Sequence, residues 1–354
     1  MIRRLQSRHC GPIGIDLGAK AVKLIQFNST GTEIVESACW NLAVQEEGKS
    51  RDLPSLWVDA IRQACVGRRF RGRKAIVCLS DRELFIQNIR IFKSSSDEVM
   101  ERHVEQEAAG RIPFPLAEAS LRFIEAGEVR QGDTAMREVI LMACHQPVLD
   151  EVLAVVEAAG LLPVGVEVEP VALLRSYFAQ GRRELDRVSH ALYAHVGYSG
   201  TSVTIARGDQ ILFVKYLPLG GKQFDQAVAR HLELGLSEAG SLRQHNGDRR
   251  ADEQDPDIAR GIREATREVV SQLCLEVNRC VRYFHVTFRG QSLERVIVGG
   301  GEATDQLTEA FASHLNIKAE LGAPLRSHVS GAVAGRATQW DVAAGLALRD
   351  CELV

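Results

Sequence analysis

Three glycine-containing turns hold the residues of this sequence that could do chemistry. GIDLGAK at 14–20 and VGYSGT at 196–201 each separate two short apolar segments, and GGG at 299–301 separates an apolar segment from a helical one. A tight hairpin of small residues exposes backbone N–H groups that suit phosphate oxygens. A glycine turn before a helix lets the backbone approach a nucleoside and points the helix N-terminus at it. One such turn is commonly only a turn, so it is the ordered set of three that predicts a nucleotide site.

Carboxylates lie in or near these turns. Asp16 in the first turn could hold Mg²⁺ through water, because magnesium prefers carboxylates and keeps several of its waters. Glu167 and Glu169 lie where a group that orients a water could project, and a pair of surface carboxylates is the alternative interpretation. They are weak candidates for catalysis.

The elements around the turns repeat. Residues 13–42 alternate with period two and predict three strands, 52–67 have helical spacing, and 75–79 form a buried strand. The same order of strand, glycine turn, strand, turn and strand returns at 191–217. Two such halves predict an α/β protein with a duplicated domain that closes on a ligand.

A different pattern separates the halves. It reads as a strand, an acidic helix at 97–110 that IPFP at 112–115 stops, and two further strands. We therefore predict a small α+β subdomain at 82–155, inserted in a first lobe at 11–81 and 156–189. A second lobe follows at 190–350, with a mobile polar loop at about 236–257 and a long helix at 258–288.

Composition excludes several classes of protein. Of 354 residues, 43 are basic and 46 acidic, which argues against nucleic acid as the main partner. Eight cysteines are scattered without a CxxC pair, so we expect reduced thiols rather than zinc or disulfides. No apolar stretch has the length of a membrane span or a signal peptide, which predicts a cytoplasmic chain.

The three turns resemble the first phosphate, second phosphate and adenosine motifs of the superfamily of actin, heat-shock chaperones and sugar kinases. Within it, the chain from about residue 11 to 349 resembles the PilM family, actin-like components of type IV pilus assembly related to the division protein FtsA. The segments that carry this resemblance are AIVCLSDRELFIQNIRIF, EQEAAGRIPFPLAEASLRF, VEVEPVALLRSY, LPLGGKQFDQAV and AAGLALR. The resemblance implies an actin-like (ribonuclease H-like) fold of two lobes, with an insertion like that of FtsA.

The resemblance also implies ATP with Mg²⁺ in the cleft between the lobes. The positions that match the motifs are Asp16, Gly18 and Lys20; Gly197, Ser199, Gly200 and Thr201; Gly220 and Gly221; and Gly299, Gly300 and Gly301. Lys222, Arg279 and Arg282 are further candidates, the two arginines on a helix that would flank the adenine. An ordinary role as surface charges is an equally good interpretation of these three residues.

A partner is implied as well. PilM proteins bind the short cytoplasmic N-terminus of the bitopic membrane protein PilN, near the inserted subdomain. We therefore expect a chain that contacts the inner membrane indirectly, through a PilN-like protein, with self-association as a further option.

One position departs from the pattern. The second phosphate motif usually begins with an acid, and His195 takes its place. Histidine is not a hard oxygen ligand, and its protonated form would repel a metal ion. We therefore expect ATP to bind through Asp16 and backbone amides, with weak or absent hydrolysis. The alternatives are an FtsA-like division or filament protein, a type II secretion scaffold, or a sugar- or acetate-type kinase, which would need a carboxylate base.

Overall fold

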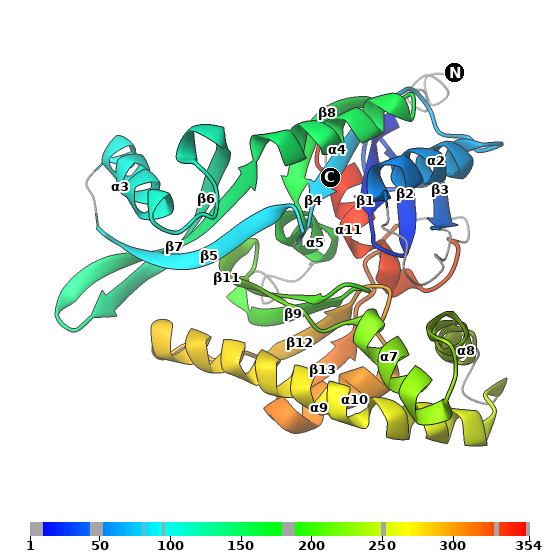
Figure 1. Cartoon of the computed structure of the whole chain (residues 1–354). Helices are drawn as coiled ribbons and strands as arrows, with labels where there is room; N and C mark the ends of the chain where they lie inside the picture. The colour runs from blue at the N-terminus through cyan, green and yellow to red at the C-terminus, as the bar shows by residue number, and fades with distance from the viewer. Residues whose placement is uncertain are drawn as a thin grey trace.

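A computed structural model describes residues 10–42, 52–80, 82–93, 96–178, 188–248, 253–328 and 333–351. Within these ranges the strands form two five-stranded sheets and one three-stranded sheet (Figure 1). The two larger sheets form the two predicted lobes, and the smaller one belongs to the predicted insertion.

The two large sheets have the same layout. The first has the order β3-β2-β1-β4-β8, from β1 (Cys10–Leu17), β2 (Ala21–Asn28), β3 (Ile34–Asn41), β4 (Lys74–Leu79) and β8 (Leu162–Val168). The second has the order β11-β10-β9-β12-β13, from β9 (His190–Val196), β10 (Thr201–Arg207), β11 (Gln210–Leu217), β12 (Arg295–Gly299) and β13 (Lys318–Leu321). In each, the opening strand pairs antiparallel with the second and parallel with the fourth. The predicted duplication is confirmed.

Helices cover both sheets, and their ends follow local signals. In the first lobe, α2 (Leu53–Cys65) begins at the cap Asp52, with a proline in its first turn, and buries the apolar stripe that includes Trp57 and Ile61. In the second lobe, α9 (Pro256–Thr287) begins at the cap Asp255. The remaining helices of the lobes are α4 (Gln146–Ala158), α5 (Glu169–Phe178), α7 (Gly221–Leu232), α8 (Leu236–Asp248), α10 (Asp305–Leu315) and α11 (Asp341–Ala347).

The inserted subdomain packs on the second lobe. Its sheet has the order β5-β7-β6, from β5 (Leu84–Phe92), β6 (Ala119–Gln131) and β7 (Thr134–His145), with α3 (Asp97–Ala109) on one face. Val104 of α3 packs there with Leu141 of β7. The opposite face contributes Ile140 and Met142 to the same core as Phe284 of α9. In Figure 1 the three strands accordingly lie over one end of α9.

Two predicted boundaries need correction. Helix α4 lies inside the range predicted for the insertion, yet Val152 and Val156 belong to the core of the first sheet with Trp57. Helix α11 lies in the range predicted for the second lobe, but it packs against α5, β1 and β2 of the first, as Figure 1 shows. We propose that the first lobe comprises 10–80, 146–178 and α11.

The prediction of a mobile loop at about 236–257 is wrong for residues 236–248, which form α8. This helix has few apolar residues, and an ion pair fixes it to α7. Arg243 pairs with Asp225 of α7, and Gly240 packs closely on the same carboxylate. Apolar periodicity does not reveal such a helix. Residues 249–252 of the predicted loop lie outside the described residues.

Candidate functional site

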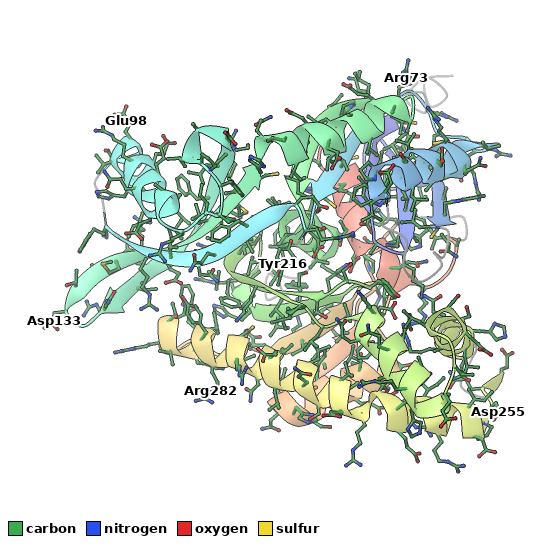
Figure 2. All side chains as sticks on the ribbon, in the orientation of Figure 1. Arg73, Glu98, Asp133, Tyr216, Asp255 and Arg282 are labelled. Atoms are coloured by element: carbon green, nitrogen blue, oxygen red, sulfur yellow. The ribbon has the colours of Figure 1, made fainter. Side chains whose placement is uncertain are left out.

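The first and second glycine hairpins face each other across a cleft between the lobes. A cavity of about 140 Å³ separates them, and Tyr216 of β11, labelled in Figure 2, is one of the residues that line it. Seven of the predicted cofactor residues line it: Asp16, Gly18, Lys20, Gly197, Ser199, Gly200 and Gly301. Small hairpin residues and cationic side chains thus meet where a phosphate chain could lie.

Close backbone packing shapes the first hairpin. A Cβ atom on Gly18 would lie 2.6 Å from the carbonyl oxygen of Ala21, so only glycine fits this turn. The indole Nε1 of Trp57 donates a hydrogen bond of 3.1 Å to the Gly18 carbonyl, which ties the turn to α2. The turn then directs Lys20 across the cleft, where its Nζ lies 3.6 Å from Asp225 Oδ2 of the second lobe and over the Tyr198 ring.

Asp16 is part of a buried ion pair. Nζ of Lys23, on the next strand, lies 2.7 Å from its Oδ2, and both side chains are largely buried. Burial alone would lower the pKa of Lys23, but the Asp16 carboxylate raises it, so the ammonium stays charged. The prediction that Asp16 holds Mg²⁺ is therefore not supported, because a cation of the protein already neutralises this carboxylate. Lys23 is not among the site residues predicted from the sequence, although the cross-strand register that places it opposite Asp16 could have indicated it.

The second hairpin is fixed by the start of α7. The N–H groups of Gly221 and Lys222 donate to the carbonyls of Gly197 and Tyr198. A Cβ atom on Gly220 would collide with the Gly197 carbonyl. These predicted ligands instead support the hairpin, and the Lys222 side chain is exposed outside the cleft. Thr201 is also structural: it is buried, and its hydroxyl donates to the carbonyl of Leu219.

His195 stands at the end of β9, beside this hairpin, and is paired with a carboxylate from the C-terminal part of the chain. Its Nδ1 lies 2.9 Å from Oδ2 of Asp341, a fully buried residue at the start of α11. The same oxygen accepts a hydrogen bond of 2.9 Å from the N–H of Gly300. Burial alone would lower the pKa of His195, but Asp341, together with Glu169 and Asp16, raises it to about 9. The imidazole is thus a cation at neutral pH.

The third turn serves mainly to join elements. A Cβ atom on Gly299 would collide with the Asp341 carboxylate, and one on Gly300, whose φ is +91°, would collide with the Val196 carbonyl. Gly301 alone of the three lines the cleft. Next to it, Glu302 pairs with Arg243 at 2.6 Å.

A second cavity, of about 410 Å³, continues from this turn. It is bounded by α7, α8, α9 and the start of α10, and Glu302 borders both cavities. From α9 it is lined by Arg263 and Thr266, which the sequence analysis missed. The predicted Arg279 and Arg282 lie elsewhere: Arg279 pairs with Glu276 and borders β5 and β11, and Arg282 projects from α9 into solvent (Figure 2).

The distance along α9 explains this error. At about 1.5 Å per residue, Arg279 stands roughly 20 Å along the helix axis from Thr266. The sequence predicts the helix but does not show which of its turns faces the glycine loops.

The two catalytic candidates differ in position. Glu167 forms two hydrogen bonds of 2.5 and 2.6 Å with Arg175, which also donates to the Gly345 carbonyl, and this carboxylate does not line the cleft. Glu169 does line it, where it accepts a hydrogen bond of 2.5 Å from the Ser202 hydroxyl. The suggestion that Glu167 projects into the site is therefore wrong.

Comparison with known proteins now identifies the family. The family model described as type IV pilus assembly protein PilM matches residues 14–351. The chain belongs to the PilM family. Among solved structures, the PilM–PilN type IV pilus biogenesis complex is similar, with a TM-score of 0.77 and 25% identity over 96% of this chain and 98% of that one. Membership favours pilus assembly over the division-protein, type II secretion and kinase alternatives.

More distant structures share the fold. EutJ from Carboxydothermus hydrogenoformans matches with a TM-score of 0.56 and 15% identity, over 96% of this chain and 89% of that one. MreB 5 of Spiroplasma citri bound to AMPPNP matches with a TM-score of 0.50 and 12% identity, over 95% of this chain and 94% of that one. The predicted actin-like fold is confirmed. No helix in the described part of the chain is long and apolar enough to cross a membrane.

Proposed function

We propose that this chain is an ATP-binding scaffold of type IV pilus assembly that docks the cytoplasmic N-terminus of a PilN-like inner-membrane protein. The observation that carries the proposal is the pair of facing glycine hairpins in a PilM-family chain. The nucleotide would act as a structural or switching ligand that stabilises one arrangement of the lobes.

The two adjoining cavities support ATP as the ligand. The phosphates would lie between Gly18 and Gly200, which line the cleft from the two hairpins beside Lys20. The nucleoside would occupy the larger cavity, with Arg263 and Thr266 on one side. Mg²⁺ is not part of this proposal, because Lys23 occupies the carboxylate that was expected to hold it.

The proposed partner rests on the similar complex, in which PilM is bound to PilN. In this chain the insertion packs on the second lobe through Ile140 and Met142 of β7, and Cys144 of the same strand belongs to the core of the first lobe. A PilN-like peptide near the insertion would thus bind a subdomain that contacts both lobes, and would respond to how the lobes are arranged. The chain would then lie in the cytoplasm and reach the inner membrane through this protein.

Two glycines make a matched test of the ATP site. Gly301 lines the cleft and Gly235 is exposed at the start of α8, and a Cβ atom on either would meet open space. We expect ATP to raise the Tm of the wild type and of Gly235→Leu, and not that of Gly301→Leu, whose side chain would fill the cleft. Equal ATP stabilisation of all three proteins would place the nucleotide elsewhere.

Partner binding needs a separate measurement. A labelled peptide with the N-terminal sequence of a neighbouring PilN-like protein should bind the full chain in fluorescence anisotropy, and a scrambled peptide should not. Absence of both peptide binding and ATP stabilisation would refute the proposed function.

A further inference from the structure

Cationic side chains border the cleft. Four of its lining residues are cationic, Lys20, Lys23, Arg82 and the protonated His195, beside three carboxylates, Asp16, Glu169 and Glu302. Lys20 and His195 are paired with Asp225 and Asp341, which do not line the cavity, so the cations and not these two carboxylates border the space for a phosphate chain.

Each of the three carboxylates already has a partner of its own. Asp16 binds Lys23 at 2.7 Å, Glu302 binds Arg243 at 2.6 Å, and Glu169 accepts a hydrogen bond of 2.5 Å from Ser202. Within the described residues, no three His, Cys, Asp or Glu side chains come together as a metal-binding group. A Mg²⁺ ion on a nucleotide takes most of its oxygen ligands from phosphates and waters and one or two from carboxylates. The carboxylates that could serve here are already held by Lys23, Arg243 and Ser202, so this set of donors does not favour Mg²⁺.

We propose that the cleft binds the phosphate chain of its nucleotide as a free anion, without a divalent cation, and that His195 contributes positive charge to it. The proposal rests on the proposed ATP-binding function and specifies its ligand. It assigns to a side chain of the protein the charge neutralisation that a metal ion would otherwise supply.

The geometry of His195 supports this assignment. Asp341 holds Nδ1 and thereby fixes the ring and keeps it charged. The other ring nitrogen, Nε2, lies close to Gly197 in the phosphate-facing hairpin, 3.8 Å from the place where a Cβ atom on that glycine would be. From there an N–H group can donate a charge-assisted hydrogen bond to a phosphate oxygen.

Calorimetric titration of the full chain with ATP tests the proposal directly. One titration contains EDTA and the other an excess of MgCl₂. We expect the two affinities to agree within about threefold, a difference that corresponds to less than one ordinary hydrogen bond. A loss of about tenfold or more in EDTA would overturn the inference and leave the ATP-binding function intact. No binding under either condition would overturn both.

Two variants test the role of His195, with a surface histidine as control. In His195→Asn the amide can still donate to Asp341, but the positive charge is lost, so ATP affinity in EDTA should fall by about tenfold. In His195→Asp a new carboxylate faces the phosphates, so binding should become dependent on Mg²⁺. His231→Asn on the exposed surface of α7 should leave affinity unchanged. An unchanged affinity of His195→Asn in EDTA would show that His195 does not contact the phosphates.

Discussion

The buried pair of His195 and Asp341 predicts a specific dependence of stability on pH. The pKa of His195 is raised from 6.5 to about 9 in the folded protein. Its stabilising contribution is therefore fully present below about pH 6.5 and is lost as the pH rises through about 9. At 1.36 kcal/mol per pKa unit, the loss between these limits is on the order of 3 kcal/mol.

Urea unfolding from pH 6 to pH 9.5 measures this contribution. The free energy of unfolding of the wild type should be compared with that of His195→Asn at each pH, because cysteines and other groups also titrate at high pH. The difference between the two proteins should shrink by about 3 kcal/mol over this range. The exposed His231→Asn variant should show no such trend. A constant difference between wild type and His195→Asn would refute the charged pair.

Four further substitutions test the packing around the cleft and at the inserted subdomain. Arg243→Met removes the shared partner of Asp225 and Glu302, so the free energy of unfolding in urea should fall by about 3–5 kcal/mol, and a loss below about 1 kcal/mol would contradict a buried network. Gly300→Ala should cost about 1–3 kcal/mol because of its φ of +91°, whereas Gly301→Ala, in open space, should change thermal stability little. Glu138→Gln breaks the buried contacts of this carboxylate with the insertion and α9, so thermal unfolding should show a loss of about 1–3 kcal/mol, and hydrogen exchange in β7 should rise; unchanged exchange would argue against this link.

Much of the fold could be predicted because its signals are local. The alternation of 13–42 specifies three strands, and the capped apolar stripe of α2 specifies a helix, as the structure confirms. The repeated hairpins identified the duplication, and the helix predicted to end at Gly110, before the prolines, ends at Ala109. In each case neighbours in the sequence carry the information.

What could not be predicted depends on contacts between distant segments. The apolar pattern of α11 predicts a helix but does not show that it packs on the first lobe. Helix α8 forms because Arg243 reaches α7, which no apolar period reveals. For α9 the sequence predicts a long helix at 258–288 but does not indicate that Arg263, and not Arg279, borders the proposed nucleoside cavity.

The charge of the cleft is the clearest case of this kind. From the sequence, histidine in place of an acid suggests only a missing metal ligand. In the structure Asp341, 146 residues away, accepts hydrogen bonds from both His195 and Gly300. One carboxylate therefore sets the charge of the second hairpin and anchors the third glycine turn, and it does so from α11, a helix that packs on the first lobe. Asp341→Asn should consequently lower both the pKa of His195 and the affinity for ATP in EDTA, whereas a purely structural Asp341 would lower stability alone.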